Sequence, residues 1–258
     1  SEALRSDLMM GRIAEEIAKR EEDVKLVVRR HRPLPGLLTV MRHNAPFLPY
    51  EYYFSLSILI KTVSAAAKLE RMLLELLHND TFRNSLKYEN VPLWPTLSEP
   101  FHVMFFDIFV GMIRHYETWL HIIRTERPKG IVVESEYSSL GMGAIAAGKE
   151  CSVPSLAVQH GGVHPYNPGY VRIPRATKEG LEELSLRPIA DRTAVFGEYV
   201  REILIERGGY PPDRVVATGQ PRFDTILEDA SGFKEEDIRH RFGLLCKRRV
   251  ILCIMHAF

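Results

Sequence analysis

The chain has 258 residues, with 34 Lys and Arg against 33 Asp and Glu, so its formal net charge is only +1. That balance gives no overall field to attract nucleic acid or an anionic membrane, and we predict no nucleic-acid partner. The composition, 45% hydrophobic and 26% charged, is typical of a soluble globular protein. The three cysteines form neither a CxxC pair nor an even-numbered framework, which favours a reducing, cytoplasmic compartment.

The N-terminal segment is predicted to contain a helix and then a strand. Apolar residues at helical spacing predict a helix over residues 8–20, and the β-branched run DVKLVV predicts a strand over 23–28. Four prolines and clustered basic residues then predict an irregular connection over 29–49, without another regular element.

Two long helical patterns follow, at residues 51–78 and 101–125, and we expect this block to cover a face of a sheet. Three prolines in the intervening NVPLWPTLSEP prevent one continuous helix. The most apolar segment, 101–123, is interrupted by polar residues, among them Asp107, Arg114, His115 and Glu117, which make it too polar for a membrane span. We expect it to be a helix that is mostly buried in the protein.

The clearest pattern is a strand, helix, strand unit between residues 130 and 159. GIVVES (130–135) predicts the first strand, SSLGMGAIAAGKE (138–150) the helix and SVPSLAVQ (152–159) the second strand. Short links of this kind are typical of βαβ units, whose strands are parallel. The pattern continues with strands at 192–197, 213–219 and 248–255 and with helices at 198–208 and 223–230. We therefore predict an α/β fold, with a Rossmann-like parallel sheet flanked by helices.

Ligands of open α/β sheets bind at the carboxyl ends of the parallel strands, where loops converge and helix N-termini present free N–H groups. The first such end is ESEYSSLGMG, in which Glu134 and Glu136 are candidate general bases. Ser138 is either a helix cap or a ligand contact. Gly141 and Gly143 likewise favour either close packing of the helix or approach of a ligand.

The second strand end carries QHGG. Gly161 and Gly162 permit a positive φ or close approach of the backbone to a ligand, and with Gln159 they are candidate substrate-binding residues. His160 is a candidate acid, base or phosphate contact. We interpret His164 as a structural loop residue. No metal site is predicted, because a zinc pair of these two histidines would have no third ligand nearby.

The third strand end is VATGQPRFD, where Thr218, Gly219 and Arg222 are candidate substrate-binding residues, the arginine for an anion. Pro221 and Asp224 are better explained as a turn that leads into a helix. The sequence has no P-loop, no GxGxxG at a strand end, no GxSxG and no HExxH. Their absence disfavours the common nucleoside-triphosphate, NAD, esterase and zinc-protease sites.

The segments VVESEYSSLGMGAIAAGKECSVPSLAVQHGG and AVFGEYVREILIERGGYPPDRVVATGQPRFD resemble the surface- and capsular-polysaccharide members of the GT-B superfamily. This superfamily comprises glycosyltransferases and related sugar-nucleotide enzymes with two facing Rossmann-like domains. The resemblance covers residues 124–258, and its most specific parts are Gln-His-Gly at 159–161 and Thr-Gly-x-Pro-Arg-x-Asp at 218–224.

The resemblance implies a transferase that moves a sugar from a nucleotide-sugar donor, its substrate, to a glycan or lipid-linked acceptor, without a further cofactor. It implies an acceptor-side domain over residues 1–190, with a helical insertion at 51–125. Residues 191–258 would continue the βαβ pattern and lead into a second Rossmann-like domain. The donor-binding remainder of that domain is not represented in the sequence, so we expect this chain alone to be inactive. His160 would face the ligand, with Glu134 or Glu136 as a secondary candidate.

Three alternatives remain open. A UDP-sugar 2-epimerase and a polyol-phosphate transferase belong to the same superfamily, but QHGGVHP matches neither the His-Val-Glu-Ala-Gly-Leu-Arg pattern of the former nor the Trp-His-Gly-Thr pattern of the latter. The third alternative is a non-catalytic module that binds a glycan or nucleotide.

Basic residues beside FLPYEYYFSLSILI form either a solvated loop or a peripheral contact with the inner membrane face. A homodimer is also left open.

Overall fold

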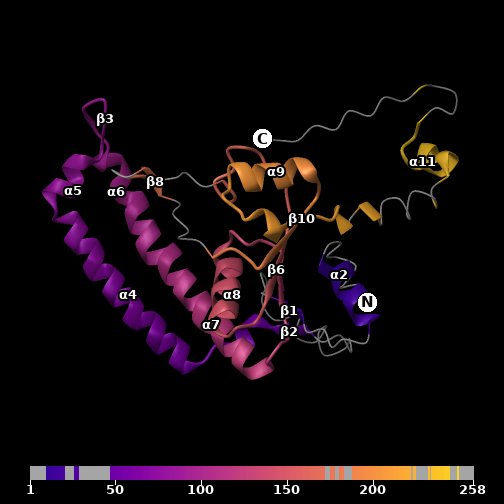
Figure 1. Ribbon diagram of the computed structural model, residues 1–258, viewed down its shortest axis with the longest axis horizontal. Helices are drawn as coiled ribbons and strands as arrows, with labels where there is room; N and C mark the ends of the chain where they lie inside the picture. The colour runs from indigo at the N-terminus through magenta and orange to yellow at the C-terminus, as the bar shows by residue number, and fades with distance from the viewer. Residues whose placement is uncertain are drawn as a thin grey trace.

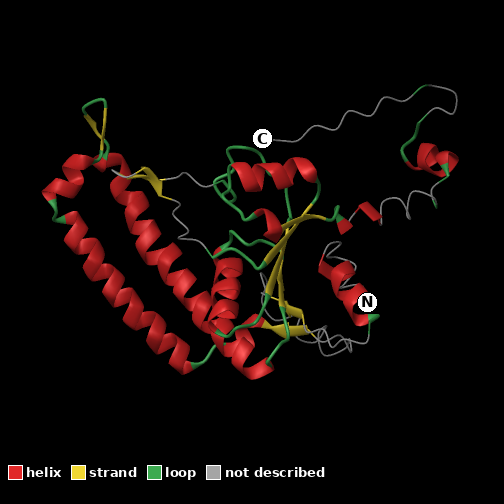
Figure 2. Ribbon diagram, in the orientation of Figure 1, coloured by secondary structure: helices red, strands yellow, loops and turns green. Residues whose placement is uncertain are grey.

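The computed structural model describes residues 10–20, 26–28, 47–171, 175–177, 180–182, 188–221, 223–224, 232, 234–244 and 249. Over these residues the fold is α/β, as the sequence predicts, with a four-stranded parallel sheet flanked by helices. Figures 1 and 2 show the sheet near the centre and a long helical arm extending from one side of it.

The central sheet consists of β5 (Ile131–Val133), β6 (Ser155–Val158), β9 (Arg192–Val195) and β10 (Val215–Ala217). Its order is β10-β9-β6-β5, and every neighbouring pair is parallel. Each strand lies within one of the predicted strand segments. Because the strands are parallel, their carboxyl ends lie at one edge of the sheet, which we call the carboxyl edge.

The sheet crosses the predicted domain boundary between residues 190 and 191. Leu156 of β6 is in register with Arg192 of β9, and Val158 with Ala194. The boundary therefore does not separate two sheets, and β9 and β10 extend the sheet that β5 and β6 begin. The final predicted strand, at 248–255, lies outside the described residues apart from Arg249, so the second domain stays a prediction.

Two apolar clusters hold helices on the sheet. α8 (Ser139–Glu150) packs against both β5 and α7 (Val110–Glu126), and α9 (Glu198–Glu206) packs against β9 and β10. The α8 cluster contains Leu120, Ile123, Ile131, Val133, Ala144, Ile145, Ala147, Ala157 and Ala190. The α9 cluster contains Val163, Tyr170, Ile189, Val195, Val200, Ile203, Leu204, Tyr210 and Val215.

Two glycines of α8 are required for its close packing. A Cβ at Gly141 would lie 2.0 Å from the carbonyl oxygen of Ser135, and a Cβ at Gly143 would lie 3.0 Å from the backbone nitrogen of Tyr116 in α7. The distance at Gly141 leaves no room for a side chain and the one at Gly143 is tighter than most Cβ contacts, so both glycines allow close packing of α8.

The helical arm comprises residues 56–126. It consists of α4 (Leu56–Leu77), α5 (Asp80–Ser85), the hairpin β3 (Lys87–Tyr88) and β4 (Val91–Pro92), α6 (Trp94–Val103), the π-helix η2 (Met104–Phe109) and α7. α4 packs on α7, α7 on α8, and α8 on the sheet, in the succession seen in Figure 1. The helix that packs directly on the sheet is therefore α8, and the block expected to cover a sheet face lies mostly behind it, with Leu120 and Ile123 of α7 reaching the same apolar cluster.

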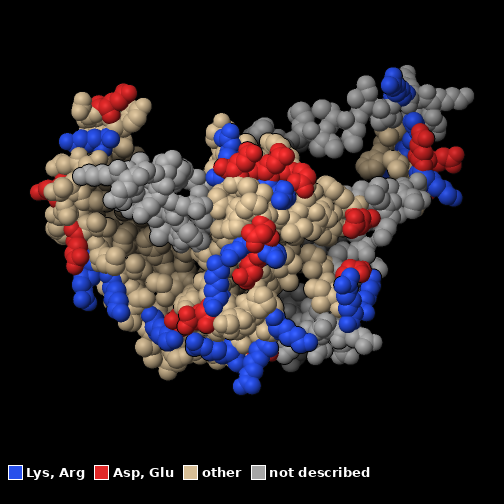
Figure 3. Space-filling model, in the orientation of Figure 1, with Lys and Arg blue, Asp and Glu red and all other residues tan. Residues whose placement is uncertain are grey.

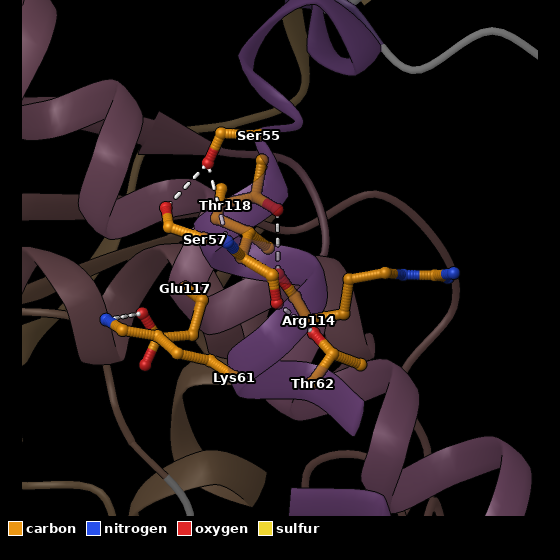
Figure 4. Close-up of polar contacts among 8 residues, drawn as sticks. Ser55, Ser57, Lys61, Thr62, Arg114, Glu117 and Thr118 are labelled. Atoms are coloured by element: carbon orange, nitrogen blue, oxygen red, sulfur yellow. Dashed lines mark hydrogen bonds and ion pairs between the residues drawn. The ribbon is translucent and has the colours of Figure 1, made fainter. Parts of the chain in front are cut away.

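Polar contacts hold α4 in the arm, as Figure 4 shows. Ser55 caps α4 by accepting a hydrogen bond from the Ile58 N–H at 3.4 Å. Lys61 of α4 forms an ion pair with Glu117 of α7, with 2.6 Å between Nζ and Oε2. These contacts lie at the sheet-proximal end of α4, where the arm joins the rest of the protein.

The arm differs from the sequence prediction in three respects. The second long helix, predicted to begin at residue 101, begins at Trp94 with α6 and includes Pro100. Proline has no N–H to donate within the helix, and the π-helical turn η2 follows shortly after it. The segment 101–123, expected to be mostly buried, is buried mainly towards its C-terminal end, at Leu120, Ile122 and Ile123. By length and composition alone, the helix Trp94–Glu126 is also apolar enough to cross a membrane, contrary to the expectation from the sequence. Its inner end packs on α8, but Val103, Phe106 and Ile108 are each 45–50% exposed because α4 covers one side only.

The remaining elements are short. They are α2 (Met10–Ala18), β1 (Leu26–Val28), β2 (Phe47–Pro49), the 3-10 helices η1 (Tyr50–Tyr53) and η3 (Pro212–Arg214), β7 (Arg175–Thr177), β8 (Gly180–Glu182) and α11 (Glu235–Arg241). β1 and β2 form a parallel pair. The expectation of no regular element over 29–49 is thus wrong at its end, where β2 gains backbone hydrogen bonds from β1.

Candidate functional site

The carboxyl edge brings together loops that are distant in the sequence. The loop after β6 begins with Gln159 and His160, the loop after β9 begins with Phe196, and the loop after β5 contains Tyr137. Gln159 is hydrogen-bonded to Phe196, and the ring of His160 lies against that of Tyr137. Three of the four strands therefore contribute to one cluster around His160.

Gln159 is the most buried member of this cluster, at 2% exposed. Its Oε1 accepts a hydrogen bond from the Phe196 N–H at 2.8 Å, and its Nε2 donates to the Gly161 carbonyl at 2.7 Å. Its backbone N–H donates to the carbonyl of Ala194 at 2.9 Å. The side chain expected to contact substrate thus faces protein on both sides.

His160 is partly exposed and lies directly after β6 and Gln159. Its ring centroid is 5.7 Å from that of Tyr137, which packs edge-on against Tyr170 at 5.0 Å. The Nδ1 atom of His160 is shielded from solvent and has no hydrogen-bond partner among the described residues. Shielded polar atoms are normally paired, so this nitrogen lacks a partner that such an atom usually has.

The three predicted site glycines differ in conformation. Gly219 has a φ of +84°, in the left-handed region that favours glycine. The structure gives no such φ for Gly161 or Gly162, so neither uses the conformational freedom that was expected. A Cβ at Gly161 or Gly162 would meet no atom within 4 Å, so open space lies beside the backbone next to His160.

Glu136 is placed differently from the general base that was expected. It is only 4% exposed, below the carboxyl edge. Oε1 accepts a hydrogen bond from the Tyr210 hydroxyl at 2.9 Å, and Oε2 accepts one from the Thr193 hydroxyl at 3.3 Å. Burial, with a smaller contribution from the Glu136 charge, raises the pKa of the nearby Tyr170. These contacts give the carboxylate a structural role in joining the loop after β5 to β9.

The other residues of the loop after β5 are Glu134 and Ser138. Ser138 caps α8, since its hydroxyl accepts from the Gly141 N–H at 3.0 Å and donates to the Ser135 carbonyl at 2.8 Å. The helix-cap interpretation of Ser138 is confirmed, and a ligand would have to compete with both bonds. Glu134 is partly exposed, and its role as a base stays a prediction.

The third strand end lies beside β9. The Thr218 N–H donates to the Val195 carbonyl at 2.9 Å, which continues the pairing of β10 with β9. Thr218 and Gly219 are exposed, and their contribution to binding stays a prediction. Arg222 lies outside the described residues, so its predicted anion contact is not described.

Helix α9 begins next to the Gln159 cluster. Its N-cap, Gly197, directly follows Phe196 and supplies no side-chain cap, and the first helical residue is Glu198. Sequence reasoning missed three residues of this region: Phe196 and Tyr137, which belong to the cluster around His160, and Tyr210, which holds Glu136. Phe196 contributes a backbone N–H, which carries no side-chain signal, and aromatic residues on loops are too common to single out the tyrosines.

His164 lies apart from these contacts. It is exposed, and its Nδ1 accepts a hydrogen bond from the Tyr166 N–H at 3.3 Å, consistent with the predicted loop role. Within the described residues, no group of three or more His, Cys, Asp or Glu side chains could hold a metal ion.

The opposite edge of the sheet has a different character. Asp191, just before β9, accepts hydrogen bonds from the N–H and the hydroxyl of Ser155, both at 2.8 Å. Burial alone would raise the pKa of Asp191, but these bonds and the charges of Lys149 and Arg214 lower it below its ordinary value. This pair ties the starts of β6 and β9 together.

The chain has little similarity to known proteins. No protein-family model matches it, and no curated protein matches its sequence. Among solved structures, it is similar to the UDP-N-acetylglucosamine 2-epimerase from Rickettsia bellii, with a TM-score of 0.36 and 14% identity. The match covers 52% of this chain and 33% of the epimerase chain, so this chain spans about a third of that length. Similarity at this level supports no conclusion about activity or site residues.

Proposed function

We propose that this chain forms the acceptor-side part of a GT-B glycosyltransferase-like enzyme of surface polysaccharide synthesis. The enzyme would move a sugar from a nucleotide-sugar donor to a glycan or lipid-linked acceptor. The sequence resemblance over residues 124–258 supports the proposal. The observation that carries it is the placement of His160 at the carboxyl edge, where its shielded Nδ1 has no partner among the described residues and open space lies beside Gly161 and Gly162.

The chemistry requires a group of this kind. In glycosyl transfer, the bond from the anomeric carbon to the diphosphate oxygen breaks, a bond to the acceptor oxygen forms, and the acceptor hydroxyl proton goes to a base. A neutral imidazole can accept that proton, and a protonated one can hydrogen-bond the departing diphosphate. Because Glu136 is engaged by Tyr210 and Thr193, His160 is the better candidate for either task.

A lipid-linked acceptor would place the enzyme at the cytoplasmic face of the membrane. The exposed side of α4 supports a peripheral contact there, since Leu56, Ile60 and Val63 share one helix face and are 59–72% exposed. Residues 52–69 include two lysines and no acidic residue, which suits an anionic lipid surface. Figure 3 shows an uncharged area on the face of the arm turned to the viewer, bordered by charged side chains at the tip and along the outer edge of the arm.

One experiment tests both parts of the proposal. A panel of nucleotide sugars is incubated with the protein that carries this chain, with and without a lipid-linked acceptor in anionic vesicles, and released nucleoside diphosphate is measured. We expect release that depends on the acceptor, and protein that sediments with the vesicles. The exposed double variant I60E/V63E should stay folded and sediment less.

Other outcomes would contradict the proposal. Conversion of UDP-N-acetylglucosamine to its 2-epimer without an acceptor would instead indicate an epimerase. Nucleotide-sugar binding without any turnover would indicate a non-catalytic module. Equal sedimentation of I60E/V63E and the unsubstituted protein would reject the membrane contact by α4.

A further inference from the structure

Gln159 holds two strand-end loops in one arrangement. Its amide oxygen accepts from Phe196, the residue that precedes the N-cap of α9, and its amide nitrogen donates to Gly161, the residue after His160. The two bonds, at 2.8 and 2.7 Å, are short and leave each end of the amide with a protein partner. At 2% exposed, the side chain offers no surface to a ligand.

The Gly161 bond is the shorter of two side-chain bonds to the glycine pair, since the other, from the Asn167 amide to the Gly162 carbonyl, is 3.4 Å long. Gly161 and Gly162 have open space where side chains would be, and glycine has the widest range of backbone conformations. The hydrogen bond from Gln159 to the Gly161 carbonyl therefore restricts the backbone directly after His160. The imidazole itself packs against the ring of Tyr137, with 5.7 Å between the ring centroids.

We propose that Gln159 is a positioning residue, which sets the His160 ring and the Gly161 peptide relative to the start of α9. It acts through these groups and does not itself touch substrate. Its effect on turnover rests on the proposed function, whereas its effect on the loop does not. The two are therefore measured separately.

Two substitutions separate the two bonds. Q159E keeps an oxygen to accept from the Phe196 N–H but places a second oxygen against the Gly161 carbonyl, so only the Gly161 bond is lost. Q159M has a similar volume and loses both bonds.

Gln220 provides a matched control, because it lies after β10 and its Oε1 is shielded without a partner among the described residues. Q220M removes an amide from the same edge without breaking a bond of this kind.

The first measurement is structural and requires no activity. In NMR spectra of the folded variants, we expect the His160 ring and the Gly161 and Gly162 amide resonances to shift in Q159E and Q159M but not in Q220M. The Phe196 amide should exchange with solvent at about the original rate in Q159E and about tenfold or more faster in Q159M, because only Q159M removes its acceptor. Unchanged His160 and glycine resonances in Q159E would overturn the proposal, and Q159E alone suffices if Q159M does not fold.

The second measurement is turnover of the nucleotide sugar. Loss of alignment at a catalytic group costs on the order of 10²-fold, so we expect kcat to fall by about that factor in Q159E while KM for the donor changes little. The ratio of the Q159E rate to the rate of the unsubstituted enzyme should rise as pH falls. At low pH the carboxyl group introduced by Q159E is protonated and can again donate a hydrogen bond to the Gly161 carbonyl. A merely structural role would give no such recovery.

The outcomes distinguish the two proposals. Shifted resonances in a protein without transferase activity would reject the proposed function and leave the positioning of the loop intact. Full activity of Q159E, in a protein that does transfer sugar, would reject the positioning role.

Discussion

At the scale of single residues, the structure divides the predicted site into side chains that have hydrogen-bond partners in the protein and groups that do not. Glu136, Ser138 and Gln159 are engaged by neighbours, whereas His160, Gly161 and Gly162 keep unoccupied hydrogen-bonding atoms or space. Residue type alone singled out both groups and did not distinguish them. The hydrogen-bond partners that separate them, such as Phe196 for Gln159, lie up to 74 residues away and have no local signal.

The glycines provide a direct test of this division. G141A should lower the free energy of unfolding by several kcal/mol, because its Cβ would overlap the Ser135 carbonyl at 2.0 Å. G161A should change it by less than about 0.5 kcal/mol, because the new methyl group meets no atom. Chemical denaturation of both variants measures the difference. Equal destabilisation would show that the space beside Gly161 is not open.

At the scale of elements, the two edges of the sheet have different tasks. The carboxyl edge carries the candidate site, and the opposite edge carries the Ser155–Asp191 pair that joins β6 to β9. The four strands and helices α8 and α9 could be predicted because β-branched runs and glycine or proline punctuation are local signals. Helix α6 could not, because its continuation through Pro100 depends on packing against the rest of the arm.

The Asp191 pair predicts a pH dependence of stability. The pKa of Asp191 is lower in the folded protein than its ordinary value of about 3.9, so its contribution is complete above that value and is lost as pH falls through the lower, folded pKa. D191A should cost about 1–3 kcal/mol at pH 7, because the buried N–H of Ser155 loses its acceptor. Urea denaturation from pH 7 to pH 3 should show this difference shrinking only at the acidic end. A difference that is constant with pH would contradict the account.

At the scale of the whole molecule, a sheet with a candidate site at one edge is joined to a long helical arm that exposes apolar side chains (Figure 1). The order β10-β9-β6-β5 is sequential, so the described strands contain no reversal that would mark a ligand crevice. The site is therefore identified from the residues around His160. Sequence periodicity predicted the helices of the arm but not their exposure, because burial depends on how many sides of a helix find a partner.

The central claim is that His160 does the chemistry at the carboxyl edge. The most direct test compares H160A with H164A, because His164 is an exposed histidine of the same loop whose Nδ1 already has a backbone partner. In acceptor-dependent turnover of the nucleotide sugar, we predict that H160A loses about 10²-fold or more in kcat with an unchanged free energy of unfolding. H164A should stay within about twofold of the unsubstituted enzyme, since a solvated loop side chain contributes little. Equal rates for H160A and H164A would contradict the account.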